Sequence, residues 1–263
     1  MRRRVPARSS PTTGRPPTPI RPDGRGPGPS AVGSRTVTTL GFRGVLLDWR
    51  GTLVVAPTYA WLVATALEQL GRSHDDDAVE QVLARLRATD RTRVESSTID
   101  TDAAEHRAAY AHWFRTAGID DELAAALYAV ESDVSLNPFA HDVEPLLVAL
   151  SDAGVRIGVV SDIHVDLRPV FAAHPLPDGR TWADLVDVWA LSFELGVAKP
   201  DPAIFRAALD GLGLPAADVL MVGDRGAWDG AAAEIGITTL VLPPLARPED
   251  ARLHRVLALA LDD

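Results

Sequence analysis

The chain has 263 residues, 46% of them hydrophobic, and a formal net charge of −10 at pH 7. This length and composition favour one core domain with a smaller second domain, and the apolar runs are far shorter than the ~18 residues that a membrane-spanning helix needs. Cysteine is absent, which excludes disulfides, thiolate metal sites and thiol nucleophiles and fits a cytoplasmic protein.

The charge is unevenly distributed along the chain. Residues 1–36 contain eight Arg and one acidic residue, Asp23, so the rest of the chain holds 18 basic and 35 acidic residues. Such an acidic body does not suggest nucleic-acid binding. Because residues 1–36 are rich in Pro, Arg, Ser, Thr and Gly and offer little apolar surface to bury, we predict that they form a disordered tail.

The rest of the chain shows two patterns. After a first core strand, predicted for 37–48, come consecutive helices with Pro or acidic residues in their first turns. These helices are predicted at 57–70, 75–88, 102–116 and 120–131. From residue 137 helices alternate with apolar strands, which predicts a parallel sheet with helices on both faces. The strands are predicted at 155–160, 185–190, 219–222 and 238–242, and the helices at 143–153, 167–173, 202–212, 229–235 and 248–261.

Four short stretches share one layout, an apolar run followed by polar groups. They are VLLDWRGTL at 45–53, GVVSD at 158–162, GVAKP at 196–200, and LMVGD at 220–224 with Asp229 after it. Polar groups at the carboxyl ends of parallel strands lie at the ligand-binding crevice of an open α/β sheet. In this order, the stretches resemble the four signature motifs of the haloacid dehalogenase superfamily of hydrolases, over roughly 45–242.

The resemblance implies an α/β fold with a Rossmann-like parallel sheet core and an inserted α-helical cap domain. The core would comprise residues 37–56 and 138–263, and the cap would comprise residues 57–137, between the first and second motifs. The alternative for these helices is an elaboration of the core that has no role in substrate choice.

The resemblance also implies catalytic roles. Asp48 matches the family's nucleophile, whose carboxylate attacks phosphorus and forms an aspartyl-phosphate. Thr52 and Ser161 match positions where hydroxyls hold phosphoryl oxygens, although either residue could instead serve an ordinary turn or helix cap. Lys199 matches the lysine that neutralises charge on the nucleophile and on the transferred phosphoryl group.

Lys199 also stands out by composition, because it is the only lysine and the other 25 basic residues are Arg. A lysine in such a background favours a site that needs a compact ammonium rather than a planar guanidinium, with chance as the alternative. The prolines at 200 and 202 resemble the Lys-Pro-x-Pro form that is common in the family.

Three carboxylates match the metal site of the family. Asp224 and Asp229, together with Asp48, would form a site of hard oxygen ligands suited to Mg²⁺. In the family, the residue two positions after the nucleophile adds its backbone carbonyl, a group that Arg50 also has.

Arg50 departs from the family pattern, because phosphatases of this superfamily usually have aspartate there. That aspartate protonates the leaving group and later deprotonates water, whereas arginine keeps its charge and cannot exchange this proton. General acid–base help is worth ~10²–10⁴ in rate. Other branches also replace the aspartate: phosphonoacetaldehyde-cleaving enzymes read Asp-Trp-Ala-Gly-Thr, which shares Trp49 but requires a cap lysine that this chain lacks, and haloacid dehalogenases have Tyr.

Other polar residues could act on the substrate. His164, just after the second motif, is either a substitute acid or a residue that caps or packs. In the predicted cap we expect most polar side chains to lie on solvated helix faces, and the candidates for substrate contact are Arg85, Arg87, Arg91, Arg93, His106, Arg107 and Tyr110.

We therefore predict Mg²⁺-dependent phosphoryl transfer from a small phosphorylated metabolite through Asp48, without nucleic-acid or membrane partners. Arg50 favours a substrate with a good leaving group or one that supplies its own proton. One alternative is a catalytically impaired member that binds a phosphorylated ligand or a protein partner. Another is carbon–halogen or carbon–phosphorus cleavage, although the pair Asp224 and Asp229 argues against a metal-free dehalogenase.

Overall fold

The computed structural model describes residues 41–261. The tail predicted for 1–36 and the start of the first predicted strand lie outside the described residues. Among the described helices, none is both long enough and apolar enough to cross a membrane.

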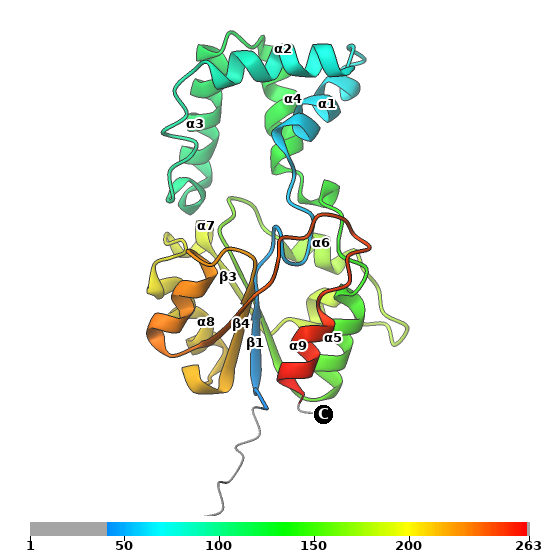
Figure 1. Ribbon diagram of the computed structural model, residues 1–263, viewed down its shortest axis with the longest axis vertical. Coiled ribbons are helices and arrows are strands. Elements are labelled where there is room, and N and C mark those ends of the chain that lie inside the picture. Colours follow the sequence, from blue (N-terminus) through cyan, green and yellow to red (C-terminus); the bar gives the residue numbers. More distant parts are fainter. Residues whose placement is uncertain (1–40, 262–263) are drawn as a thin grey trace, which may run out of the picture. The chain divides into compact units, whose positions relative to one another are not determined.

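Five parallel strands form one sheet in the order β3-β2-β1-β4-β5 (Figure 1). Their bounds are Gly44–Leu47 for β1, Arg156–Ser161 for β2, Val188–Leu191 for β3, Val219–Gly223 for β4 and Thr238–Val241 for β5. The central position of β1 places its carboxyl end between those of β2 and β4. The parallel α/β core expected from the alternating pattern is thus confirmed.

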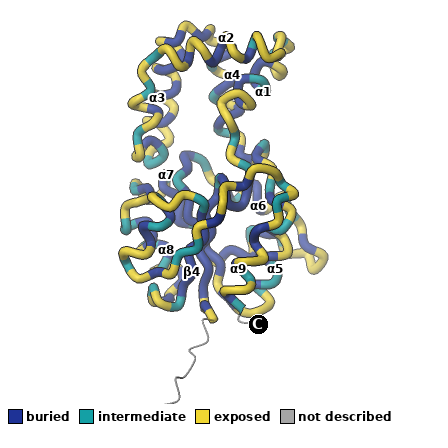
Figure 2. The backbone as a smooth tube through the Cα atoms, in the orientation of Figure 1, coloured by how far each residue is buried: buried dark blue, intermediate teal, exposed yellow. Residues whose placement is uncertain are grey.

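The two faces of the sheet are both covered by helices, as the nearly continuous apolar runs of its strands require. Val45 and Leu47 of β1 pack on one side and Leu46 on the other, and all three are completely buried. The first side is covered by α5 (Val143–Asp152), α6 (Arg168–Ala172) and α9 (His254–Ala260), and the second by α8 (Pro202–Leu212) and the 3₁₀ helix η5 (Asp229–Ile235). The central strands β1 and β4 are buried along their whole length, and Figure 2 shows the middle of the sheet as buried.

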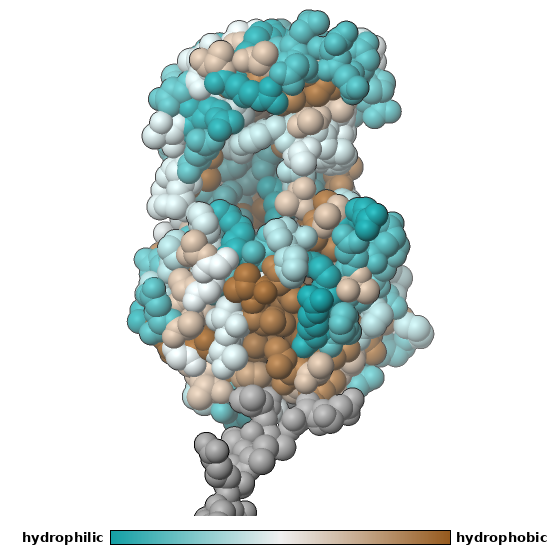
Figure 3. Space-filling view, viewed as in Figure 1, coloured by the Kyte–Doolittle hydropathy of each residue, from teal (hydrophilic) through white to brown (hydrophobic). Residues whose placement is uncertain are grey.

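Five α-helices lie between β1 and β2 in the chain, and the first four have a hydrophobic cluster of their own. These four are α1 (Tyr59–Gln69), α2 (Asp76–Arg87), α3 (Ala103–Thr116) and α4 (Asp121–Ser132). Their apolar faces bury side chains such as Leu67, Leu83, Trp113 and Leu127 against one another, and each such side chain contributes about 1.5–3 kcal/mol. The exposed charged residues of α2 make its outer surface hydrophilic (Figure 3). The helical insertion is confirmed, and its limits at 57 and 137 stay predictions.

Side-chain caps explain where these helices begin. Thr58, Asp75, Asp102 and Asp120 each accept a hydrogen bond from a backbone N–H of the first turn. Each cap lies within one residue of the predicted start, and in three of the four helices the cap is an aspartate at that start. Short 3₁₀ helices complete the connections: η1 at Ile99–Thr101, η2 at Val134–Leu136, η3 at Trp182–Leu185 and η4 at Ala216–Asp218.

Several elements differ from the sequence-based expectation. The first strand begins only at Gly44, and the helix predicted at 229–235 is the 3₁₀ helix η5. The last helix, predicted from residue 248, begins at His254, because Asp142 Oδ2 accepts the N–H groups of Arg252 and Leu253 at 2.6 and 2.7 Å and holds this stretch in another path. The strand predicted at 185–190 begins only at residue 188, after η3.

Candidate active site

The turn after β1 contains the first two predicted site residues. The Asp48 N–H donates to the Val222 carbonyl at 2.9 Å, which continues the pairing of β1 with β4 up to this residue. The chain then turns at Gly51, whose φ of +84° suits glycine and where a Cβ would lie 2.3 Å from Asp224 Oδ2. Thr52 is fully buried, and its hydroxyl donates to Asp48 Oδ2 at 3.0 Å. The turn therefore fixes the orientation of the Asp48 carboxylate.

Lys199 is buried beside the same carboxylate. It lies in the loop between α7 (Ser192–Leu195) and α8, and its Nζ is 2.5 Å from Asp48 Oδ1 and 2.7 Å from Asp229 Oδ1. Its backbone N–H donates to Asp162 Oδ1 at 2.8 Å, which holds the loop to the end of β2. Burial lowers the pKa of Lys199, but the carboxylates of Asp48 and Asp229 outweigh this and hold that pKa above its ordinary value. The ammonium therefore stays charged.

Asp48, Asp224 and Asp229 each have one carboxylate oxygen that lies within 4.8 Å of those of the other two. Three carboxylates exceed the single positive charge of Lys199, and burial, with the charges of the other two aspartates, raises the pKa of Asp224 to about 6. Asp224 Oδ1 is buried without a hydrogen-bond partner among the described residues. An unpartnered oxygen, surplus negative charge and an all-oxygen set of ligands fit Mg²⁺.

Ser161 is the last residue of β2, next to β1, and it is buried. The structure thus brings the predicted residues Asp48, Thr52, Ser161 and Lys199 to the carboxyl ends of the central strands, with the two aspartates that follow β4. Their catalytic roles stay predictions.

The Arg50 side chain points toward the helical insertion. Its guanidinium donates to Glu131 Oε1 and to the Glu131 backbone carbonyl, both at 3.0 Å, and to Asn137 Oδ1 at 3.2 Å. Glu131 and Asn137 are both buried. Arg50 therefore joins the turn that bears Asp48 to the carboxyl end of α4.

The other candidates are distributed between surface and interior. His164 is buried and contacts Asp100 and Ser132, and His106 and Tyr110 are buried within the helical insertion. Arg107 covers the ring of Tyr128 at 4.8 Å. The remaining arginines make hydrogen bonds or ion pairs at the surface, as expected for solvated helix faces. They are Arg85, Arg87, Arg91 and Arg93.

Sequence reasoning missed several residues around the site. Buried Arg252 donates to the carbonyls of Gly51 and Thr52, at 3.3 and 2.6 Å, and so braces the turn after β1. It lies about 200 positions further along the chain, and no sequence signal links the two segments. Asp162 could have been found, because it directly follows Ser161 in the second motif.

A family model of haloacid dehalogenase-like hydrolases matches residues 42–236, more than half of the chain. The chain belongs to the haloacid dehalogenase-like hydrolase family. The matched range contains all four motifs, so the resemblance drawn from them is confirmed.

Individual relatives are more distant. A phosphoglycolate phosphatase of Rhodospirillum rubrum is 36% identical over 97 residues, which is 37% of this chain and 38% of that protein's own length. The fold is similar to that of a 2-haloacid dehalogenase from Pseudomonas syringae, with a TM-score of 0.53 and 22% identity over 80% of this chain and 90% of that one. It is also similar to a family enzyme from Bacteroides thetaiotaomicron in complex with magnesium and inorganic phosphate, with a TM-score of 0.55 and 17% identity over 79% of this chain and 97% of that one.

Proposed function

We propose that this hydrolase is a Mg²⁺-dependent phosphatase that acts on a small phosphorylated metabolite through an aspartyl-phosphate on Asp48. The observation that supports this proposal best is the contact of Lys199 Nζ with both Asp48, at 2.5 Å, and Asp229, at 2.7 Å. A buried ammonium beside the nucleophile neutralises the charge that gathers when a phosphate approaches a carboxylate.

In the first step an oxygen of Asp48 attacks the phosphorus atom, and the bond from phosphorus to the leaving oxygen breaks. The electron pair goes to the leaving oxygen, which takes a proton from water or keeps its charge. Lys199 offsets the charge on the phosphoryl oxygens, and the Ser161 hydroxyl donates a hydrogen bond to one of them. The Thr52 hydroxyl, which has a single proton, turns from Asp48 Oδ2 to donate to a phosphoryl oxygen once the substrate is bound. Thr52 already holds Asp48 Oδ2 at 3.0 Å, so the carboxylate is oriented before the substrate enters.

In the second step water attacks the phosphorus atom, the bond to Asp48 breaks, and inorganic phosphate leaves while the carboxylate is restored. The proton of the attacking water passes to phosphate or solvent. Bound Mg²⁺, held by Asp48, Asp224, Asp229 and the Arg50 carbonyl, would stabilise negative charge on the phosphoryl group.

Phosphate release from a panel of phosphorylated metabolites, with Mg²⁺ or with EDTA, tests the proposal. We expect release that EDTA suppresses. A 2-haloacid and a phosphonate are included as control substrates, and release of halide or carbon–phosphorus cleavage without phosphatase activity would refute it.

A second candidate function is that of a catalytically impaired member of the family, which binds a phosphorylated ligand and hydrolyses it slowly. It is favoured by the contacts of Arg50 with Glu131 and Asn137, which occupy the side chain that replaces the usual proton carrier. Binding of inorganic phosphate without hydrolysis of any ester in the panel would support this candidate over the phosphatase.

Mg²⁺ should stabilise the wild-type fold, because a ligand that binds only the folded state raises the free energy of unfolding by mass action. The melting temperature should rise with Mg²⁺, and the rise should vanish in the double variant Asp224→Asn, Asp229→Asn. It should also be smaller below about pH 6, where protons compete for Asp224. Asp178→Asn, at an exposed position, is the control, and an equal Mg²⁺ response in the double variant would contradict the site.

Lys199→Arg should lower phosphate release by about 10²–10³-fold, the loss seen when one charge-stabilising donor is removed. The guanidinium is larger and planar, and the buried space between Asp48 and Asp229 holds a compact ammonium. The initial rate on an aryl phosphate measures the effect, with the exposed change Arg247→Lys as control. Full activity of Lys199→Arg would show that the lone lysine is an accident of composition.

A further inference from the structure

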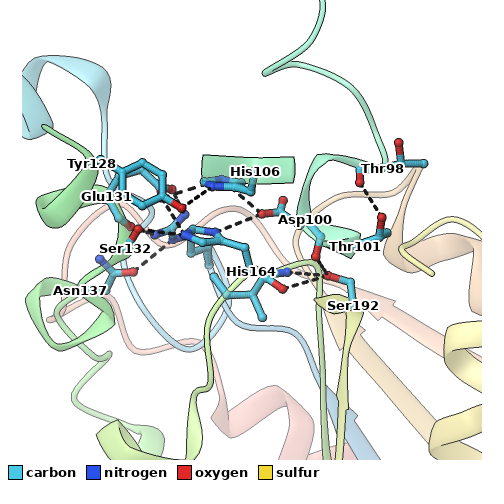
Figure 4. Close-up of polar contacts among 12 residues, drawn as sticks. Thr98, Asp100, Thr101, His106, Tyr128, Glu131, Ser132, Asn137, His164 and Ser192 are labelled. Atoms are coloured by element: carbon cyan, nitrogen blue, oxygen red, sulfur yellow. Dashed lines mark hydrogen bonds and ion pairs between the residues drawn. The ribbon is translucent and has the colours of Figure 1, made fainter. Parts of the chain in front are cut away.

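A second cluster of titratable side chains lies outside the group around Asp48. It contains Asp100 of η1, His106 of α3, Glu131 of α4 and His164 of the loop after β2 (Figure 4). Both histidines are almost completely buried, with 1% and 3% of their surfaces exposed. The cluster therefore joins the helical insertion to the α/β core.

The distances converge on one carboxylate oxygen. Asp100 Oδ1 lies 3.3 Å from His164 Nδ1 and 3.7 Å from His106 Nε2. Each of the three residues offers one possible ligand atom within 4.8 Å of those of the other two. The two imidazole rings are stacked, with centroids 3.4 Å apart and planes 9° from parallel. Two buried rings at this separation cannot both be charged at low cost.

In each histidine the nitrogen nearer to Asp100 is called the inner nitrogen and the other the outer nitrogen. The outer nitrogens have hydrogen-bond partners of their own. His106 Nδ1 lies 3.2 Å from the Tyr128 hydroxyl, and His164 Nε2 lies 3.0 Å from the Ser132 hydroxyl. Histidines that bind metals almost always use the second nitrogen for such a bond, which fixes the tautomer. Without a metal, His164 Nδ1 donates to Asp100 Oδ1 at 3.3 Å, and a bound metal would take the place of that proton.

A further observation points to a missing cation. Glu131 Oε2 is buried, 3.2 Å from His164 Nε2 and 3.9 Å from His106 Nε2, in a geometry that forms no hydrogen bond with any described residue. The only arginine contacts of Glu131 given by the structure come from Arg50, through Oε1 and the backbone carbonyl. A buried carboxylate oxygen without a partner is costly unless a charge or a proton compensates it.

We propose that Asp100, His106 and His164 form a second metal site, which binds a transition-metal dication such as Zn²⁺. Two imidazole nitrogens and one carboxylate oxygen suit Zn²⁺ and not Mg²⁺, so this site and the all-oxygen site at Asp48 select different ions. Water or Glu131 Oε2 would supply the fourth ligand of the metal. The lone pairs of two stacked rings lie in parallel planes and do not meet at one point. Metal binding would therefore rotate both rings toward Asp100.

A cavity lies beside residues that contact the two histidines. It has a volume of ≈ 420 Å³ and is lined by Arg107, Tyr128 and Ser132 among others, and the last two contact the outer nitrogens of the histidines. Once bound, the metal would tie α3 to the loop after β2, beside the existing 2.8 Å contact between the Ser192 hydroxyl and the Asp100 carbonyl.

The test is a Zn²⁺ titration of the chelator-treated full chain by calorimetry, with saturating Mg²⁺ present to occupy the oxygen site. We expect one Zn²⁺ per chain in the wild type. His106→Gln and His164→Gln should weaken binding by more than the ~10–100-fold that loss of an outer partner costs, and Tyr128→Phe should weaken it within that range. His112→Gln, an exposed histidine of α3, is the matched control and should bind as the wild type does.

Two results would overturn the proposal. One is a folded wild type that takes up no stoichiometric Zn²⁺, and the other is equal affinity in the wild type and the two histidine variants; either leaves the cluster as a hydrogen-bonded contact. If the histidine variants do not fold, Tyr128→Phe and the visible absorption of the Co²⁺-loaded wild type decide. Unchanged affinity, or a Co²⁺ spectrum without the intense bands of a four-coordinate site, counts against it. None of these measurements depends on turnover.

Discussion

Asp48→Asn is expected to reduce phosphate release by several orders of magnitude, the scale on which loss of a covalent nucleophile acts. The amide has nearly the shape of the carboxylate, so the contacts with Lys199 and Thr52 are altered little in geometry. It is not a nucleophile toward phosphorus, however, and no aspartyl-phosphate can form. Steady-state release from the best substrate of the panel measures the loss. Trapping of an acid-stable, base-labile phosphoenzyme should succeed in the wild type and fail in the variant.

Stability and activity have to be separated in this variant. Asp48→Asn removes one of the two carboxylates that pair with the buried ammonium of Lys199, but Asp229 remains at 2.7 Å. The melting temperature should therefore change moderately while activity disappears. Asp166→Asn, at an exposed position, is the matched control. Residual activity within tenfold of the wild type in a folded Asp48→Asn protein would remove Asp48 from the role of nucleophile.

Local signals in the sequence were enough to predict most of the helices and strands. The capping aspartates at 75, 102 and 120 mark the starts of three helices, and the apolar runs before Asp48, Ser161 and Asp224 are the strands β1, β2 and β4. These features depend on residues close together in the chain. The end of a parallel strand then places the next polar residue at the shared edge of the sheet, so the grouping of the motif residues could also be predicted.

The direction of single side chains could not be predicted in the same way. His106 was predicted as a candidate for substrate contact, yet it is buried and stacks on Tyr110, a residue of the insertion's own core, and on His164. The contacts of Arg50 with Glu131 join residues 81 positions apart. Such pairs depend on tertiary packing, and neither residue alone shows which partner it meets.

Those contacts sharpen what Arg50 does. Arginine cannot protonate a leaving group, so the wild type should hydrolyse aryl and acyl phosphates, whose leaving groups need no proton, faster than alkyl phosphates. The aspartyl-phosphate should also persist, because no side chain at this position activates water against it. Rapid-quench measurement of phosphoenzyme alongside phosphate release tests both statements.

Restoring aspartate at this position should restore the proton carrier, provided the new charge is tolerated. Glu131 is buried opposite, with its Oε1 3.0 Å from the Arg50 guanidinium, so Arg50→Asp alone would bring two carboxylates together without a cation. The double variant Arg50→Asp, Glu131→Gln removes this repulsion. We expect it to raise turnover of alkyl phosphates by up to the ~10²–10⁴ that such groups supply, while Arg50→Asp alone gains less and melts at a lower temperature.

The single variants Glu131→Gln and Arg50→Ala separate the causes of this gain. Both weaken the contact between the turn after β1 and α4, and neither supplies a proton carrier, so neither should speed alkyl ester hydrolysis. The ratio of kcat on an alkyl ester to kcat on an aryl ester is the measurement, because a general loss of structure lowers both rates and leaves the ratio unchanged. If the wild type already hydrolyses both esters equally well and the double variant is slower on each, Arg50 is a working part of the site, held in place by Glu131 and Asn137 to contact the substrate, and its replacement of aspartate is not a loss of catalysis.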